Sequence, residues 1–331
     1  MPTHTGRAVR LNRRAVLTAM LALASGAPAV TGASVARADA GAAGKVPVVA
    51  SFSILADLAH QVGGDRVDVT ALVGPGGDVH VFSPAPADAK RIAAARLIIT
   101  NGLALEGWLP RLISASGAKA PVIVASKGVN AAHLDEKAPG HVHDAAPDHN
   151  HGHDHGGLDP HAWQDVANVK IYVRNIRDGL IAADPAGRDA YENNAAAYLA
   201  RLDELDADIR RRMAAIPADH RRIITTHDAF GYFGRAYGLG LIAPQGLSTD
   251  TEASAADVAR VVRQIRAEKA PAVFLENIAD PRLMARIARE TGVKTGGQLY
   301  TDSLSLPDGP AASYIDMMRS NVGTLEKALA P

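Results

Sequence analysis

Histidine is the residue type in this chain with the most obvious capacity for chemistry. The 331 residues contain 13 histidines and no cysteine. A transition metal would therefore be held by imidazole and carboxylate groups, because no thiolate is present. Three histidines lie outside the chain's dense histidine cluster and stand beside predicted element ends: His80, His161 and His227.

Local sequence suggests how two of these side chains are positioned. His80 lies in GPGGDVHVFSPAPAD, shortly after a predicted strand ending at Val73. The glycines allow a tight turn there, which places the imidazole on a loop at the carboxyl end of a strand. His161 lies in LDPHAWQD at the start of a predicted helix, where Pro160 stiffens the approach and Trp163 supplies bulk to bury it.

The other two candidates follow strands of the second half. His227 comes directly after the predicted strand Arg222–Thr226, where a polar residue marks a site rather than a core. Asp302 lies in QLYTDSLS, after a predicted strand at Lys294–Gly297; taken alone, it is a turn or helix-cap aspartate. Three imidazoles and one carboxylate satisfy tetrahedral zinc at roughly 2.0–2.2 Å. We therefore predict a closed zinc site with four ligands: His80, His161, His227 and Asp302.

A zinc-bound histidine usually donates its second ring nitrogen to a carboxylate or carbonyl. Asp78, Asp228 and Glu276 are candidates for this role, and the sequence leaves the choice open. An alternative of a different class is an exported zinc hydrolase, with Glu276 as general base and Asp302 unligated. No HExxH motif supports that alternative. A closed site favours a receptor, and we predict that the protein is not an enzyme.

A second group of histidines lies in the segment HVHDAAPDHNHGHDHGG, which has almost nothing to bury. We expect a disordered loop over about residues 136–158. Pairs of its histidines can chelate zinc weakly, which predicts an auxiliary metal-collecting role. Six histidines make up this predicted auxiliary site: His141, His143, His149, His151, His153 and His155.

Strand and helix patterns alternate in both halves of the chain, which favours an α/β fold with two mostly parallel sheets flanked by helices. Between the halves, apolar residues recur every three or four positions from about 185 to 216, as in one long helix. The predicted boundaries are an N-terminal lobe at 39–165, a helical linker at 166–217 and a C-terminal lobe at 218–331. Ligands in such folds lie at the carboxyl ends of the strands.

Residues 1–38 have the features of a signal peptide: early arginines, a short apolar run and an Ala-Arg-Ala cleavage site. Arg13-Arg14 also suits twin-arginine export. The remaining chain has five more acidic than basic residues, which suits a cation and argues against nucleic acid. With no cysteine to carry a lipid, we predict a periplasmic protein that is not a lipoprotein.

The motifs GGDVHVFSPAPAD, DPHAW, THDAFGYF and the Asp302 segment together resemble the metal-binding solute receptors of bacterial zinc and manganese ABC transporters, of the ZnuA/AztC type. The resemblance covers essentially all of the chain after the signal peptide and places the family's ligands on the four residues named above. It implies zinc capture between two lobes and delivery to an inner-membrane ABC permease by a monomer, with a periplasmic zinc chaperone as a possible further partner. Manganese is the alternative cargo, although His227 stands where manganese-type relatives commonly have glutamate.

Overall fold

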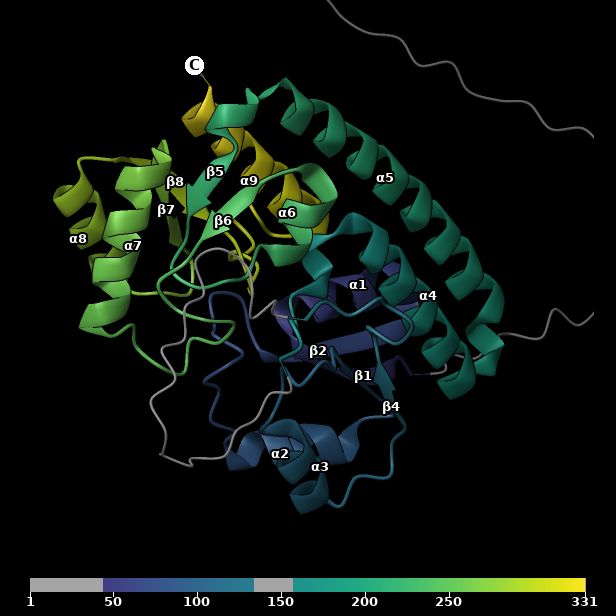
Figure 1. Ribbon diagram of the computed structural model, residues 1–331. Helices are drawn as coiled ribbons and strands as arrows, with labels where there is room; N and C mark the ends of the chain where they lie inside the picture. The colour runs from purple at the N-terminus through teal and green to yellow at the C-terminus, as the bar shows by residue number, and fades with distance from the viewer. Residues whose placement is uncertain (1–43, 134–156, 331) are drawn as a thin grey trace, which may run out of the picture. The chain divides into compact units, whose positions relative to one another are not determined.

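A computed structural model describes residues 44–133 and 157–330. They belong to one compact unit, Gly44–Pro331. It contains two four-stranded parallel sheets with the same topology, ordered β2-β1-β3-β4 and β6-β5-β7-β8 (Figure 1). The predicted α/β class with two parallel sheets is confirmed. The predicted signal peptide lies outside the described residues. Among the described helices, none has the length and apolar character needed to cross a membrane.

The N-terminal lobe forms around the sheet that contains the first strand of the described chain. Its central strands are buried on both faces because helices pack on each side, as the apolar runs VPVVASF and LIIT require. Its elements are β1 (Val46–Phe52), α1 (Ser53–Gly63), β2 (Val67–Val73), α2 (Pro86–Ala94), β3 (Leu97–Thr100), α3 (Leu109–Ser116) and β4 (Val122–Val124).

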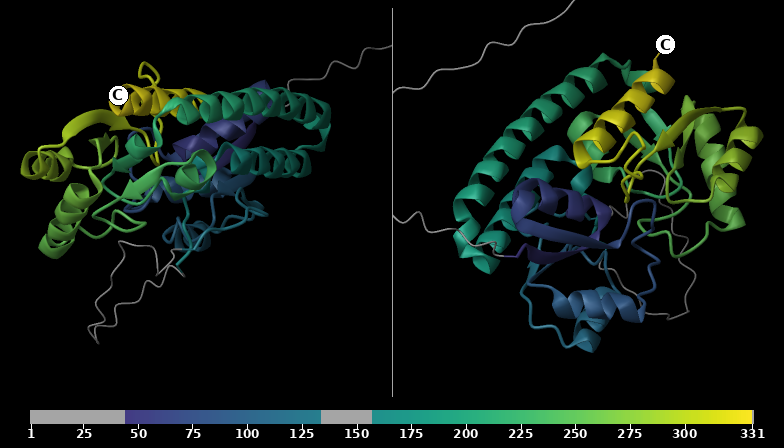
Figure 2. Two further views of the ribbon diagram at one scale, coloured as in Figure 1. Left: turned by 45° about the horizontal axis from the view of Figure 1, so that its top comes forward. Right: turned by 180° about the vertical axis from the view of Figure 1, so that it is seen from behind.

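Two helices, α4 (Val166–Ala183) and α5 (Arg188–Ala215), follow the first lobe. The predicted long helix is present but begins at Arg188, because Pro185–Gly187 forms a separate 3₁₀ turn. Helix α5 packs against α1 of the first lobe and α9 of the second (Figure 2). It therefore braces both lobes through one apolar stripe, which consists of Tyr191, Ala195, Tyr198, Leu202, Leu205, Ile209 and Met213.

The C-terminal lobe repeats the strand order of the first. Its helices α7 and α8 enclose a local apolar core against one face of the sheet, and α9 packs on β8. Its elements are β5 (Arg222–Ile224), α6 (Gly231–Tyr237), β6 (Gly240–Ile242), α7 (Ala255–Glu268), β7 (Ala272–Glu276), α8 (Pro281–Thr291), β8 (Lys294–Leu299) and α9 (Tyr314–Leu329).

The main apolar core is continuous across both lobes. Phe52 of β1, Trp163 before α4 and Tyr314 of α9 all belong to it and are fully buried. The Trp163 ring lies 5.0 Å from that of Phe52, and its indole N–H donates to the carbonyl of Thr301 at 2.9 Å. The Tyr314 hydroxyl donates to the Trp163 carbonyl at 2.8 Å. Trp163 therefore ties the first lobe to the chain beside Asp302.

One predicted helix starts later than expected. The sequence pattern indicates a helix over Leu105–Ser114, whereas α3 begins at Leu109. Gly102, Leu103 and Ala104 have φ values of 84°, 52° and 62°, so the chain turns through the left-handed region just before it. The buried Glu106 carboxylate accepts hydrogen bonds from the backbone N–H groups of Asn101 and Gly102, which holds this turn in place. Burial raises the pKa of Glu106, although these donors oppose the rise.

Candidate metal centre

Four side chains from separate parts of the sequence meet between the two sheets. His80, His161, His227 and Asp302 each offer one ligand atom, and these atoms lie within 4.8 Å of one another. His161, His227 and Asp302 are fully buried, and the side chain of His80 is nearly so. The structure thus brings together all four residues of the predicted zinc site.

The loop after β2 carries His80, and Asp78 holds this loop. One oxygen of Asp78 accepts a hydrogen bond from the His80 backbone N–H at 2.8 Å. The other accepts the hydroxyl of Thr249, from the loop between β6 and α7, at 2.5 Å. Asp78 therefore connects the first lobe's loop to the second lobe and acts on the His80 backbone.

His161 is fixed by a carboxylate two residues earlier in the chain. Asp159 lies 2.9 Å from the Nδ1 of His161 and also accepts the His161 backbone N–H at 2.9 Å. The Nε2 atom is thereby directed toward the other ligands. Sequence reasoning missed Asp159, although it stands inside the quoted motif LDPHAWQD.

His227 has a corresponding partner on the neighbouring strand. Its Nδ1 lies 2.5 Å from Oε2 of Glu276, the last residue of β7. The other oxygen of Glu276 accepts backbone N–H groups of Thr226 and His227 at 2.6 and 3.1 Å. Because β5 and β7 are parallel neighbours, both side chains stand at the same edge of the sheet. Glu276 is buried and engaged with His227, so the alternative that makes it a general base is wrong.

Asp302 follows β8 and faces all three imidazoles. Its oxygens lie 3.0 Å from Nε2 of His227, 3.3 Å from that of His80 and 3.6 Å from that of His161. The Nε2 atoms of His80 and His161 are 3.3 Å apart. Tetrahedral zinc with bonds of roughly 2.0–2.2 Å needs ligand atoms roughly 3.3–3.6 Å apart. Three of these four separations fall in that range, and all four ligand atoms are close enough together to hold one metal ion.

The buried atoms at this centre are not satisfied by the protein. His227 Nε2 and both Asp302 oxygens are buried and have no hydrogen-bond partner among the described residues. Unpaired buried polar groups are costly, and metal coordination satisfies them. These atoms point to a cation as the group that completes the centre.

Charges around the centre shift two pKa values in opposite directions. Burial alone lowers the pKa of His227, but the carboxylates of Glu276 and Asp302 raise it well above its usual range. Burial raises the pKa of Asp302, but the electrostatic attraction of the His227 and His161 imidazoles lowers it well below its usual range. The centre thus keeps Asp302 ionised and draws a positive charge toward it.

Two further histidines of the described residues, His60 and His220, are not part of this centre. His60 is exposed on α1, and His220 Nδ1 lies 2.9 Å from the Leu329 carbonyl oxygen. The predicted auxiliary site lies outside the described residues, as do all six of its histidines. Its metal-collecting role stays a prediction. Asp228, the third candidate for a supporting carboxylate, donates its backbone N–H to the Gly246 carbonyl at 3.0 Å.

Residues 48–328 match a family described as "Zinc-uptake complex component A periplasmic". The chain is 36% identical over 283 residues to the manganese-binding lipoprotein MntA of Halalkalibacterium halodurans, covering 86% of this chain and 88% of that protein. It is 32% identical over 283 residues to the iron-binding protein YfeA of Yersinia pestis, covering 86% of each. The relatives thus share one architecture but are named for different metals.

Solved structures agree with this grouping. The periplasmic zinc-binding protein TroA of Treponema pallidum has a TM-score of 0.77 at 29% identity, with 87% of this chain and 100% of that chain covered. A manganese-bound S38A mutant of a periplasmic metal-binding protein from Candidatus Liberibacter asiaticus has a TM-score of 0.75 at 30% identity, covering 86% and 100%. The two-lobed fold is therefore that of metal-binding proteins.

The relatives correct the predicted localisation. The absence of cysteine predicted a periplasmic protein that is not a lipoprotein. MntA is named a lipoprotein, and so is FimA of Streptococcus parasanguinis, which is 31% identical over 298 residues, covering 88% of this chain and 92% of that one. The names of these relatives therefore contradict the predicted lack of a lipid anchor.

The family match, the named relatives and the similar solved structures all indicate a metal-binding protein. The buried centre of three histidines and one aspartate agrees with this. The family consists of receptors that bind a metal ion and supply it to an ABC transporter, and its members are not enzymes. The hydrolase alternative is thereby excluded. The chain belongs to the ZnuA family of metal-binding substrate-binding proteins of ABC transporters.

Proposed function

We propose that this receptor captures zinc through His80, His161, His227 and Asp302 and delivers it to its permease. The supporting observation is the set of three imidazole nitrogens and one carboxylate at separations that match tetrahedral coordination. Imidazole suits zinc, whereas carboxylate, carbonyl and water ligands suit manganese. The Nδ1 contacts to Asp159 and Glu276 fix the orientation of two of the imidazoles.

Manganese is a second candidate cargo. The observation in its favour is that MntA, 36% identical to this chain, is named for manganese, and one solved relative is described as manganese-bound. Affinity alone does not separate the two ions, because most sites with nitrogen and oxygen ligands bind zinc more tightly than manganese. The coordination geometry and the metal acquired in the cell discriminate better.

Metal analysis of the protein isolated from its native cells tests the proposal. We expect about one tightly held zinc per chain and negligible manganese, since three imidazoles dominate the site. X-ray absorption should show four nitrogen or oxygen neighbours at roughly 2.0–2.1 Å. Manganese as the main metal, or six-coordinate geometry, would favour the second candidate.

Zinc affinity should fall as the pH is lowered. The raised pKa of His227 means that the metal-free centre holds a proton there at neutral pH, which zinc must displace. Each displaced proton weakens binding roughly tenfold per unit of acidification below that pKa. Chelator competition at pH 7.5, 6.5 and 5.5 should follow this trend, and affinity independent of pH would contradict imidazole ligation.

We retain the auxiliary role of the six histidines from His141 to His155 as part of this proposal. They would collect zinc weakly, and a periplasmic zinc chaperone is one source of their metal. Deleting residues 141–155 should leave one tight site and remove the weak ones, as counted by zinc titration against chelators of graded affinity. Loss of the tight site after this deletion would contradict an auxiliary role.

A further inference from the structure

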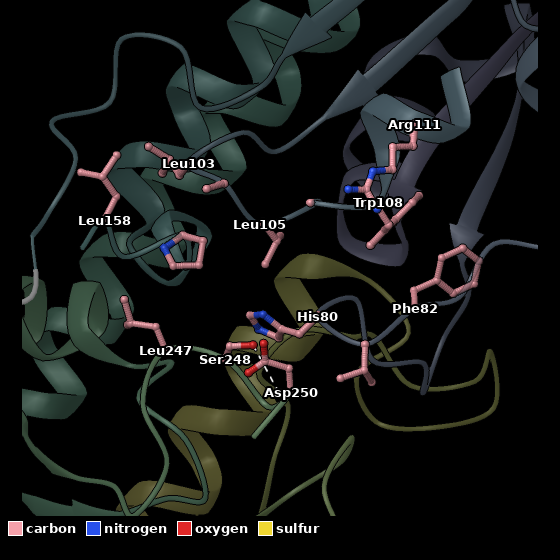
Figure 3. A pocket seen from close by; sticks show the side chains of 14 residues that line it. His80, Phe82, Leu103, Leu105, Trp108, Arg111, Leu158, Leu247, Ser248 and Asp250 are labelled. Carbon is pink, nitrogen blue, oxygen red and sulfur yellow. Dashed lines mark hydrogen bonds between the residues drawn. The ribbon is translucent and has the colours of Figure 1, made fainter. Parts of the chain in front are cut away.

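A pocket of about 330 Å³ opens beside the metal centre. His80 lines both the pocket and the centre, and of the four proposed ligands it alone is part of the pocket lining. The side chains labelled in Figure 3, His80 among them, line this space. Such a volume falls within the roughly 300–1,000 Å³ typical of small-molecule sites. An incoming metal therefore meets His80 first, through this pocket.

The pocket wall in the first lobe is built from strained backbone. Leu103 and Ala104 line the pocket at positive φ, a conformation that costs energy in non-glycine residues and clusters at functional sites. Beneath them, the Asn101 side chain donates to the Pro160 carbonyl at 3.0 Å and accepts the Tyr172 hydroxyl at 2.5 Å. The same network that holds this wall thus reaches the residue preceding His161.

The lining combines aromatic rings with single charges of both signs. Phe82 and Trp108 meet edge to face with ring centroids 4.8 Å apart. Arg111, at the start of α3, lines the pocket and has no ion-pair or hydrogen-bond partner among the described residues. Asp250 lines it from the loop between β6 and α7 in the other lobe. A hydrated ion makes no favourable contact with aromatic walls. A small ligand that carries a ring together with positive and negative groups fits this lining.

We propose that this pocket receives the organic part of a metal chelate, namely a small aromatic or apolar carboxylate that carries zinc. The ring would lie against Phe82 and Trp108, with the carboxylate toward Arg111. Zinc would then exchange its bonds to the chelator for bonds to the protein, beginning at His80, with no change of oxidation state. This inference rests on the proposed zinc site and extends it to the form in which the metal arrives and leaves.

Pyridine-2-carboxylate (picolinate) is a suitable probe because it joins an aromatic ring to a nitrogen and oxygen donor pair. The experiment measures transfer of zinc from the loaded full-length chain to excess EDTA, at rising picolinate concentration. We expect acceleration that saturates, because picolinate first occupies the pocket. Glycine has the same type of donor pair without a ring and serves as the matched chelator; it should accelerate transfer far less and without saturation.

Two variants test the pocket without touching the four ligands. A Cβ added at Gly107, which lines the pocket, would meet no atom within 4 Å, so Gly107→Trp fills the space without a backbone clash. It should abolish the saturable acceleration. Arg111→Gln should raise the half-saturating picolinate concentration roughly tenfold, because a charge-assisted contact is lost. Arg289→Gln, an exposed arginine on α8, is the charge control.

The outcomes separate this inference from the proposed function. In all three variants, the zinc affinity measured by chelator competition should stay within about twofold of that of the parent chain. If the parent chain itself binds zinc only weakly, the result contradicts the proposed function rather than this inference. A linear or absent picolinate dependence, or saturation that persists in both pocket variants, overturns the inference. The tryptophan fluorescence of the chain, which comes from Trp108 and Trp163, can be titrated with picolinate alone and tests pocket binding independently of zinc. An Arg111→Gln titration identical to the parent's would likewise overturn the inference.

Discussion

Replacing His227 by alanine is expected to weaken zinc binding roughly a hundredfold to a thousandfold. Zinc sites with four protein ligands contribute about 10–16 kcal/mol in total, so one ligand accounts for about 3 kcal/mol or more. His227 is fully buried with its Nε2 3.0 Å from Asp302, and no other side chain of the described centre can take its place. Competition against a high-affinity chelator reports on this tight site alone.

The loss should be specific to the centre. Glu276 keeps the backbone N–H of Thr226 and of position 227 as donors, so the variant should still fold, which circular dichroism can verify. His60→Ala is the matched control, since His60 is exposed on α1 and outside the centre. An unchanged zinc affinity in His227→Ala would remove this residue from the ligand set.

Replacing Trp163 by alanine is expected to lower the free energy of unfolding by about 3–5 kcal/mol, the usual cost of emptying a buried tryptophan site. Its side chain is fully buried, contacts the Phe52 ring and lies 5.3 Å from the His161 ring, centroid to centroid. The cavity would open where the two lobes share one core, so zinc affinity should fall as well. Urea unfolding of the metal-free chain isolates the stability effect.

Trp163→Phe separates packing from hydrogen bonding. It keeps most of the ring volume but loses the N–H bond to the Thr301 carbonyl. That carbonyl still accepts the side-chain amide of Gln164 at 2.9 Å, so it is not left unpaired. The expected loss is therefore only about 1–2 kcal/mol. If alanine and phenylalanine cost the same, the hydrogen bond rather than the packing would be what Trp163 contributes.

Zinc should stabilise the folded chain because the four ligands meet only in the native structure. Binding to the native state alone adds stability that grows with the ratio of free metal to Kd. The ligands come from loops on both lobes, and Asp78 and Thr249 join those same loops. The metal therefore acts as a further cross-link between two parts that already share a core.

Local sequence patterns were enough to predict most elements and the chemistry of the site. The strand before His80 ends at Val73 and β8 begins at Lys294, both as predicted, because a parallel strand in a packed sheet shows an apolar run with clear ends. The residues at those ends were also informative. His227 directly follows an apolar strand, where core packing alone would favour another apolar residue. A histidine at that position therefore indicates a site.

Other features depend on partners distant in the sequence, which local patterns do not contain. The sequence left open whether Asp78 or Glu276 supports a ligand, and it did not indicate Asp159 at all. Only the fold shows which atom each of these carboxylates contacts. The late start of α3 has the same cause. The Glu106 carboxylate holds a left-handed turn in a stretch whose residues otherwise favour helix.

The ligand types, their places at the ends of elements and the two-sheet α/β class follow from residue chemistry and periodicity, so the amino-acid pattern is enough to predict them. Only the folded chain shows that four residues spread over most of its length share one buried point, and that His80 alone among them lines a pocket. Distances between such residues depend on how two sheets and the α5 brace pack together, and no local pattern encodes that packing.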